Sequence, residues 1–268
     1  MKKILALTIL TFREGVRDRA ILGIALFSLF MISITFVVLS FFMRELDKVA
    51  IDINLSAISL AGLLLTFFVS INLMAKDIDK RTIYCVLSKP FSRAQYIWGK
   101  YLGIMLIIIA AFLILTLCSS ITLALTKSLY ANWFKGFSWM AYYKAVYASL
   151  LMFFVLNAVV VFFSSITSSS FITLLFSICI YISGQTIEEV VTYLKSIPDI
   201  EMSGMVHQTI DIVQYILPNL SVFDLKIQAA HNIPLTLTYI LGITGYAVIY
   251  SALLIVAASL IFNKKELS

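Results

Sequence analysis

Residues 145–187 read AVYASLLMFFVLNAVVVFFSSITSSSFITLLFSICIYISGQTI, and these 43 residues contain no charged side chain and no histidine. A single helix of that length would run roughly 65 Å at about 1.5 Å per residue, twice the roughly 30 Å apolar thickness of a bilayer. The segment therefore has to fold back on itself. The natural break is the Ser/Thr-rich run at 164–170, whose hydroxyl groups can satisfy backbone groups at a tight turn. This stretch predicts two membrane helices, at about 145–166 and 169–187.

The rest of the chain divides in the same way, because its charges stand in clusters separated by long apolar runs. Uncharged intervals of 24, 23 and 26 residues follow Arg19, Asp52 and Lys100, and each suits one helix crossing the bilayer, which takes about 20 residues. Membrane barrels need alternating apolar and polar residues, and open strands would leave backbone groups unpaired in lipid. We therefore expect an all-α integral membrane protein with six transmembrane helices in a single domain over 1–268. The remaining four spans are predicted at about 20–43, 55–75, 101–125 and 236–262.

The overall composition and the placement of charge agree with this fold class. The chain is 61% hydrophobic and 13% charged, whereas a soluble domain carries about 25% charged residues. The net charge of +6 is spread over short segments between apolar runs, which argues against a nucleic-acid partner. With a cytoplasmic N-terminus, the inner segments hold 13 Lys and Arg residues and the outer ones hold 7. The positive-inside rule thus predicts a multi-pass membrane protein with both termini in the cytoplasm.

Three segments show a helical apolar period without being long enough to span. The first, 1–19, is a basic amphipathic stretch that leads into the first span. The other two lie at 187–197 and 206–217, in or at the edge of the extracytoplasmic loop at 188–235, and a proline follows each of them. Each presents one apolar stripe and one polar face, as expected for a helix at the membrane interface.

The sequence carries no catalytic, cofactor-binding or metal-binding motif. A phosphate-binding loop needs Gly-Lys followed by Ser or Thr, but Gly99-Lys100 is followed by Tyr101. The three cysteines and two histidines stand apart, and there is no GxSxG or HExxH motif. The predicted spans also lack the ionisable residues that enzymes, proton relays and ion-coupled transporters place at depth. Interhelical hydrogen bonds, worth about 0.6–2 kcal/mol each, are expected from Asn72, Asn157, Ser119, Ser120 and Thr122.

The cytoplasmic segment 76–100 has more pattern than an ordinary loop. Ile83 and Leu87 belong to an apolar face beside a charged cluster, Pro90 ends that helix, and Ser92 can cap the next one. This arrangement predicts a short amphipathic helix, a turn and a second helix that together project rigidly into the cytoplasm. The alternative, an ordinary positive-inside loop, needs the charges but neither the apolar face nor the turn.

The same segment resembles the signature of type 2 ABC exporter permeases, the membrane-spanning subunits of ATP-binding-cassette exporters. The resemblance rests on Arg81-Thr82, Leu87-Ser88-Lys89-Pro90, Ser92-Arg93 and Gly99-Lys100-Tyr101-Leu102-Gly103. The family's amphipathic elbow helix is resembled by Phe12-Arg13-Glu14 with Arg17 and Arg19, and its outer-loop motif by Leu217-Pro218-Asn219-Leu220 with Phe223-Asp224-Leu225. The branch resembled most closely includes the permease for maturation of nitrous oxide reductase and other multicopper enzymes. One departure is Arg81, which stands before Thr82 where the family often has glycine.

The resemblance implies a transporter subunit that depends on partners and is not itself an enzyme. In that family two permease chains pair, each docks a separate cytoplasmic ATPase subunit that binds the ATP, and short cytoplasmic helices pass the ATPase movement to the spans. Coupling roles are implied for Glu14, Arg17, Asp77, Asp79, Arg81, Lys89, Pro90, Ser92 and Arg93.

The outer loop suggests a second site, because loops beyond about 12–15 residues are usually functional or disordered and this one has nearly fifty. A gate or a dock for an extracytoplasmic protein is expected there, with the motif Leu217, Pro218, Asn219, Leu220, Phe223 and Asp224. The alternative to the transporter hypothesis is a non-transporting membrane scaffold that anchors a complex. A membrane enzyme is the third hypothesis.

Overall fold

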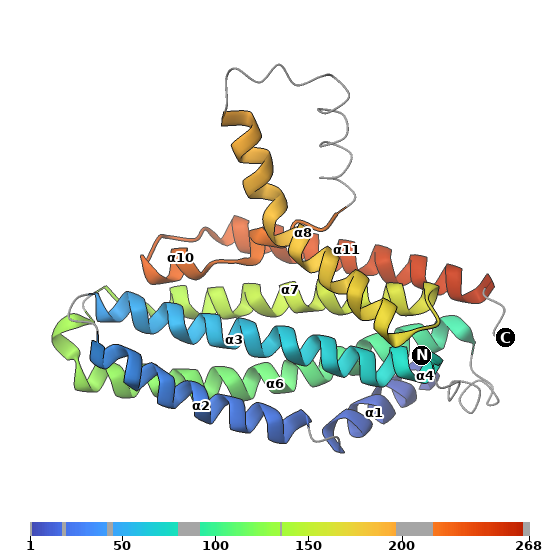
Figure 1. The fold of residues 1–268 in the computed structure, drawn as a ribbon, viewed down its shortest axis with the longest axis horizontal. Helices are drawn as coiled ribbons and strands as arrows, with labels where there is room; N and C mark the ends of the chain where they lie inside the picture. Colours follow the sequence, from blue (N-terminus) through green and yellow to red (C-terminus); the bar gives the residue numbers. More distant parts are fainter. Residues whose placement is uncertain are drawn as a thin grey trace.

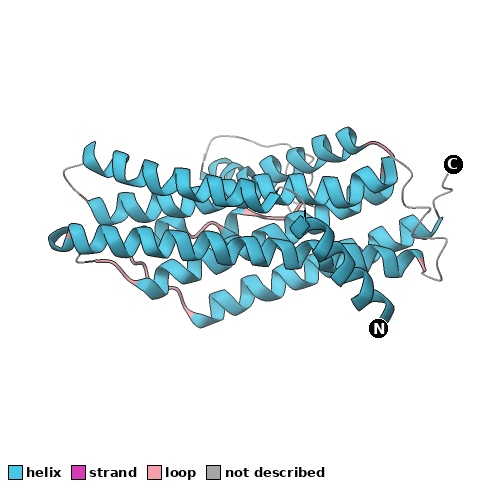
Figure 2. Ribbon diagram, turned by 90° about the horizontal axis from the view of Figure 1, so that it is seen from below, coloured by secondary structure: helices cyan, strands magenta, loops and turns pink. Residues whose placement is uncertain are grey.

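The protein is a bundle of long helices that lie side by side along the longest axis of the molecule (Figure 1). The computed structural model describes residues 2–17, 20–41, 45–79, 92–134, 136–196 and 217–264. Every regular element in these ranges is a helix (Figure 2). The first helix begins and the last helix ends at the same end of the bundle (Figure 1).

The helices follow the apolar runs of the sequence. Their bounds are α1 Lys2–Arg17, α2 Ala20–Phe41, α3 Leu46–Ser70, the π-helical turn η1 Ile71–Ala75, α4 Lys76–Asp79, α6 Arg93–Leu129, η2 Ala131–Trp133, α7 Trp139–Ile166, α8 Ser170–Ser196, η3 Ser221–Phe223, α10 Lys226–Ala230 and α11 Leu237–Lys264. Within the described ranges, five helices are long and apolar enough to cross a membrane: α3 with η1, α6, α7, α8 as far as Tyr193, and α11. The apolar helix α2 has 22 residues, and its role as a sixth crossing remains a prediction.

Two of these helices start well before the predicted spans. The helix α3 begins at Leu46, ahead of the predicted span at about 55–75. The helix α6 begins at Arg93, as the capping position of Ser92 predicted, and continues through the predicted span at about 101–125. The prediction used Asp52 and Lys100 as boundaries, but a charged residue does not end a helix, because Lys and Arg are good helix formers and even Asp is tolerated. Both side chains therefore lie within described helices but ahead of the predicted spans at 55–75 and 101–125, which themselves contain no Asp, Glu, Lys, Arg or His.

The centre of the bundle is α7, which packs against α11, α3, α6 and α8. Its inner face is built mostly of small and aliphatic residues, and it includes the fully buried side chains of Tyr142, Phe153 and Asn157. The ring of Phe153 lies 5.5 Å from that of Phe112 on α6, measured between centroids. Both rings lie so close to Gly62 of α3 that an added Cβ would come within 2.7 Å of each. Small residues at such crossings allow backbones to approach closely in a membrane bundle.

Buried polar side chains link the same helices. Asn157 of α7 accepts a hydrogen bond of 2.9 Å from Ser70 of α3 and donates one of 3.3 Å to the carbonyl of Tyr101 on α6. Ser119 donates to Asn54 at 2.8 Å and accepts from Tyr142 at 2.6 Å. The predicted interhelical bonds of Asn157 and Ser119 are thus present.

Two further polar predictions have different outcomes. Ser120 of α6 lies 3.2 Å from the hydroxyl of Tyr143 on α7, so it also forms an interhelical hydrogen bond. Thr122 donates instead to the carbonyl of Cys118 one turn earlier in its own helix, at 2.9 Å. Threonine commonly bonds back in this way, because its hydroxyl reaches the carbonyl four residues before it. Asn72 lies in the π-helical turn η1.

The chain reverses at 167–169, inside the Ser/Thr-rich run, as predicted. The Thr167 hydroxyl donates to the carbonyl of Phe163 at 2.9 Å, and Thr173 donates to that of Ser169 at 3.1 Å. These bonds supply partners for carbonyl groups next to the turn.

The following helix differs from the prediction. The helix α8 continues to Ser196, so the separate outer helix expected at 187–197 is its last part, which projects away from the bundle (Figure 1). From Ile187 on, the apolar residues of α8 are interrupted by polar ones, which makes this part of the helix amphipathic but does not end it. Pro198 follows the end of the helix. The second expected helix, 206–217, lies outside the described residues except for its final residue, Leu217.

Candidate functional site

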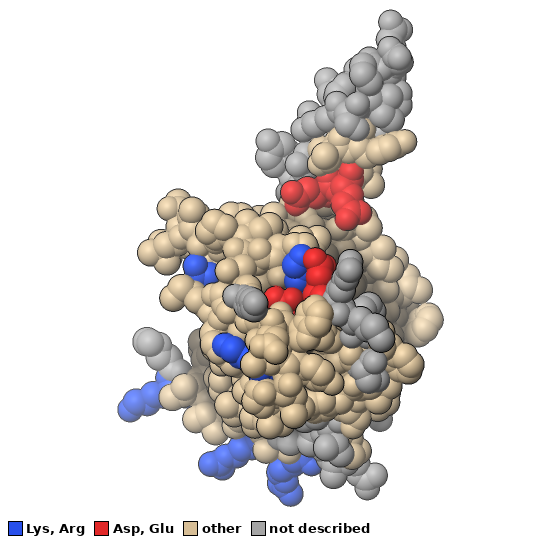
Figure 3. Space-filling view, turned by 90° about the vertical axis from the view of Figure 1, so that its left-hand side faces the viewer, with Lys and Arg blue, Asp and Glu red and all other residues tan. Residues whose placement is uncertain are grey.

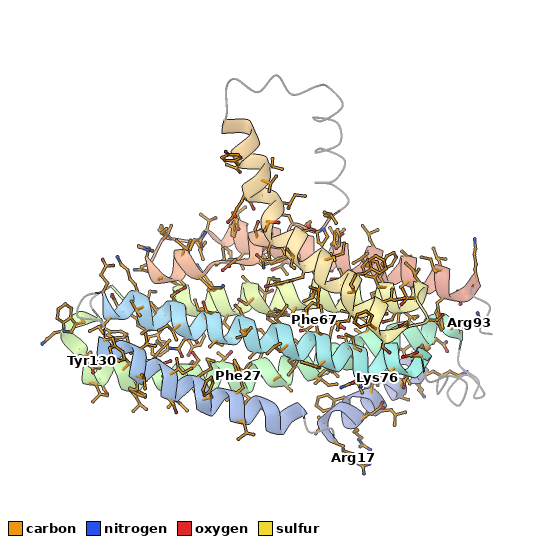
Figure 4. All side chains as sticks on the ribbon, in the orientation of Figure 1. Arg17, Phe27, Phe67, Lys76, Arg93 and Tyr130 are labelled. Carbon is orange, nitrogen blue, oxygen red and sulfur yellow. The ribbon has the colours of Figure 1, made fainter. Side chains whose placement is uncertain are left out.

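Five elements meet at one end of the bundle, which we call the α4 end. They are α1, α4, the first turns of α6 and α8, and the last turn of α11. Figure 4 shows Lys76 and Arg93 near this end and Tyr130 at the opposite end, which we call the α10 end. The helix α4 ends at Asp79 and α6 begins at Arg93, so the described parts of the predicted coupling segment at 76–100 belong to the α4 end.

A buried lysine holds the α4 end together. Lys100 of α6 is only 3% exposed, and its ammonium lies 2.7 Å from the carboxylate of Asp77 on α4 and 3.4 Å from that of Glu14 on α1. Tyr96, one turn earlier, donates its hydroxyl to Asp77 at 3.3 Å and places its ring 6.0 Å from the ammonium. We call these four residues the Lys100 cluster. It joins α1, α4 and α6 through charge.

The stability of the Lys100 cluster depends on whether the buried charge of Lys100 is paired with acids. A buried charge costs several kcal/mol unless it is paired and hydrogen-bonded, and Lys100 has two carboxylates within reach.

Asp77 follows the π-helical turn η1, whose extra residue per turn rotates the chain that comes after it. Such π turns occur often at functional sites. The turn begins directly after Ser70, which is bound to Asn157 of α7.

The helix α1 lies along the start of α6, and both run in the same direction. Leu7 contacts Gly99, Thr11 contacts Gly103, and Gly15 contacts Ile107, so that the contacts advance by one turn on each helix. An added Cβ at Gly103 would lie 2.5 Å from Thr11, which shows that only glycine permits this approach. Side chains of α1 therefore pack directly against the glycine positions of α6.

Two more of the predicted residues bind helix ends. Arg93 donates to the carbonyls of Phe262 and Asn263 at 3.1 and 3.3 Å, which are among the last carbonyls of α11. Asp79 accepts a hydrogen bond of 2.9 Å from Ser170, the first residue of α8. A cation at a helix C-terminus and an anion at an N-terminus both complement the helix dipole. Phe262 also stacks on Tyr96, with centroids 6.2 Å apart.

Ser92 caps α6, as its position before the helix predicted. Its hydroxyl accepts from the backbone N–H of Gln95 at 3.3 Å, and its own backbone N–H donates to the Gln95 side chain at 3.2 Å. This reciprocal pair is a capping box, which satisfies two backbone donors at the helix start. The coupling helix itself was predicted around Arg81, Lys89 and Pro90, and these three residues lie outside the described ranges.

The structure thus brings Glu14, Asp77, Asp79, Ser92 and Arg93 to the α4 end. Arg17 lies at the far end of α1 (Figure 4). It lines an open groove of about 820 Å³ that runs along α1 to the Lys100 cluster, together with Arg13, Glu14, Asp77 and Lys100.

Sequence reasoning missed Lys100 and Tyr96 as members of the site. The signal was the spacing of Tyr96, Lys100 and Gly103, which puts an aromatic ring, a cation and a glycine on one face of a helix that starts at Ser92. A helix face with that pattern packs against a neighbour, so its lysine is buried and needs an acid.

Away from the α4 end, the motif Leu217–Leu225 is folded onto the bundle and leads into α10. Leu220 and Phe223 are fully buried, and the backbone N–H of Leu220 donates to the carbonyl of Gly184 on α8 at 2.9 Å. The amide of Asn219 donates to Glu188 of α8 at 3.3 Å, and its backbone N–H donates to the hydroxyl of Tyr246 on α11 at 2.9 Å. The motif therefore ties α8 to α11.

The surface of the α10 end is mostly neither acidic nor basic (Figure 3). Asp and Glu side chains gather at the foot of the projecting part of α8 in that view.

Glu45, which precedes α3, pairs with Lys48 at 2.9 Å. This hydrogen bond and the charge of Lys48 lower the pKa of the Glu45 carboxyl. Beside Phe223 lies a pocket of about 310 Å³, and its lining includes the polar residues Ser149, Gln185 and Asp224. Among the described residues, no group of three His, Cys, Asp or Glu side chains is placed to hold a metal ion.

The comparison with protein families matches nearly the whole chain. The family described as ABC-2 family transporter protein matches residues 5–267. No curated protein matches the chain. The chain therefore belongs to the ABC-2 transporter family: it is an ABC transporter permease and a multi-pass membrane protein. The family generally forms the non-enzymatic membrane subunit of a transporter and normally works with an ATPase subunit. The resemblance to the nitrous oxide reductase branch stays a prediction.

Proposed function

We propose that this member of the ABC-2 transporter family is the permease subunit of an exporter in the bacterial plasma membrane, driven by a separate ATPase. In this proposal α2 is the sixth crossing, both termini and the α4 end are cytoplasmic, and a second permease chain, identical or different, completes the pathway. ATP is bound by the partner ATPase and not by this chain. The observation that carries the proposal is the Lys100 cluster, together with Asp79 and Arg93.

The cluster supports a coupling role because of where the chain leaves the bundle. The segment between Asp79 and Ser92 is flanked by α4 and α6, and both helices are held by Asp77 and Lys100. A force applied to that segment acts on both helices at once. It would pass to α1 through Glu14, and to α8 and α11 through the Asp79 and Arg93 contacts.

The coupling roles of the nine residues predicted from the sequence remain part of this proposal, now with Lys100 added. Those with a placed side chain do not form a loose charged surface. Asp77 and Arg93 are held in bonds to other helices, whereas Arg17 lines the groove beside them. Helices that are bonded to one another in this way can transmit a displacement, because packed interfaces between helices move as units.

The α10 end is proposed as the outer gate or as a dock for an extracytoplasmic protein. The support is that Leu217–Leu225 ties α8 to α11, so a change at this motif would alter the spacing of two membrane helices. Deleting 199–216 should abolish export while the ATPase still co-purifies. Export at the wild-type rate after this deletion would remove the outer role and leave the coupling proposal standing.

The docking step can be tested by charge reversal at the α4 end. Asp79→Lys and Arg93→Glu should each lower co-purification of the ATPase at least tenfold, and Arg93→Lys should restore most of it. Lys48→Glu, which changes a charge at the α10 end, is the matched control and should leave co-purification unchanged. Elution of each variant as a monodisperse peak shows that it is folded.

The same complex separates a transporter from a scaffold. A permease should stimulate ATP hydrolysis by its bound ATPase after reconstitution in vesicles, and a non-transporting scaffold should not. If folded Asp79→Lys and Arg93→Glu variants keep wild-type binding and transport, the proposed coupling site is refuted.

A further inference from the structure

A second groove lies on the other side of α1, between this helix and α6. Its volume is about 690 Å³, and its lining includes Lys2, Leu5, Thr8, Leu102, Leu106 and Ile109. This size is within the range of about 300–1,000 Å³ that is typical of ligand sites. Leu5 and Leu106 are 61% and 41% exposed, so the groove is open to its surroundings. It is separate from the charged groove that reaches the Lys100 cluster.

The groove offers almost only hydrocarbon. Thr8, its one hydroxyl, is already used, since it donates to the carbonyl of Ile4 at 3.0 Å and lies 3.4 Å from that of Gly99. Among the described residues that line the groove, Lys2 is the only charged one. A ligand that fits must therefore be apolar along most of its length and anionic at one end.

The orientation of the groove shows where the anionic end of such a ligand would lie. Because α1 runs beside α6 from the Leu7–Gly99 contact to the Gly15–Ile107 contact, Lys2 lies toward the start of α6. Leu102 and Ile109 continue inward along the span, over about 10 Å at about 1.5 Å per residue. The cation thus stands at the α4 end of the bundle, and the apolar lining extends from it into the membrane-crossing part of α6.

We propose that this groove binds one anionic phospholipid, with an acyl chain along Leu102–Ile109 and the phosphate at Lys2. Charge favours this occupant over a zwitterionic lipid. The helix α1 carries Lys2, Lys3, Arg13 and Arg17 against one acid, Glu14, which points to Lys100. A basic side chain at a membrane surface raises the affinity for anionic lipid about fivefold. The lipid would fill the space between α1 and α6 and hold the first helix in place.

The test is lipid titration of the full-length chain, purified and delipidated in detergent, with binding counted by native mass spectrometry. One phosphatidylglycerol should bind about fivefold more tightly than phosphatidylcholine. Lys2→Gln should abolish this preference. Lys264→Gln is the matched control, because Lys264 is also basic and also lies at the α4 end, on α11, and it should keep the preference.

A second pair of variants tests the groove itself. Leu106→Trp fills it and should weaken the binding of both lipids at least fivefold. Leu113→Trp changes another exposed residue of α6, which does not line the groove, and should bind as the wild type does. Equal affinity for the two lipids, or a preference that survives Lys2→Gln, overturns the proposal. So does phosphatidylglycerol binding that Leu106→Trp leaves intact, because the lipid then sits elsewhere, and a peptide or second chain would be the occupant to seek.

Discussion

Replacing Asp77 with asparagine keeps the shape of the side chain but removes the closest countercharge of Lys100, 2.7 Å away. The lysine side chain is 4% exposed, and its remaining acid, Glu14, lies at 3.4 Å and is half exposed. Removing one partner of a buried ion pair costs about 3–5 kcal/mol, because the other charge stays buried without compensation. We expect a loss of that size in the free energy of unfolding of Asp77→Asn.

The opposite change should cost less. Lys100→Met removes the buried charge itself, and it leaves Asp77, whose side chain is 21% exposed and still accepts from the Tyr96 hydroxyl. A carboxylate that keeps one hydrogen bond and part of its hydration loses about 1–3 kcal/mol. In the double variant, Asp77→Asn with Lys100→Met, no buried charge remains. Its stability should therefore exceed that of Asp77→Asn alone.

The assay is reversible unfolding of the full-length chain by SDS in mixed micelles, followed by intrinsic fluorescence. The four proteins form a double-mutant cycle, which isolates the pair energy from the two single costs. Equal losses below 0.5 kcal/mol for both single variants would refute the reasoning. They would mean that water reaches Lys100 and that the cluster does not join α1, α4 and α6.

Three further changes have outcomes that the same unfolding assay checks. Ser92→Ala removes the capping box of α6 and should cost about 1 kcal/mol; no change would mean that the cap contributes nothing. Gly184→Ala places a Cβ 2.5 Å from the carbonyl oxygen of Pro218 and should cost about 1–3 kcal/mol. Gly242→Ala, which meets open space, is its control and should cost nothing, so equal effects would contradict the close packing. Asn157→Ala breaks the bonds to Ser70 and to α6 and should cost about 0.6–2 kcal/mol; a gain in stability would show that these bonds do not form.

The sequence was sufficient where structure depends on local chemistry. The all-helical fold follows from apolar runs too long and too continuous for anything else. The turn at 167–169 follows from the length of 145–187 and from its hydroxyl-rich break, and the start of α6 follows from Ser92. Each of these features depends on residues close together in the chain, so that spacing alone reveals them.

The features that it left out depend on contacts between distant residues. Lys100 stands at the boundary of a charged loop in the sequence, and the packing of α1 against Gly99 and Gly103 shows that it is buried. The end of α8 reads as a separate amphipathic helix, because the periodic pattern does not show whether a helix continues from the one before it. The residues at the α4 end were found as a charged segment, but their partners on α8 and α11 come from the far half of the chain.

The central claim is that ATP energy enters at the α4 end and moves the α10 end. Spin labels at Leu129 of α6 and Ile227 of α10, both exposed, would report that movement in a cysteine-free chain bound to its co-purified ATPase. We predict that ATP shifts the distance between the labels in the otherwise wild-type protein. The double variant Asp77→Asn with Lys100→Met should hydrolyse ATP without this shift. An equal shift in both proteins, or none in either, would contradict the account.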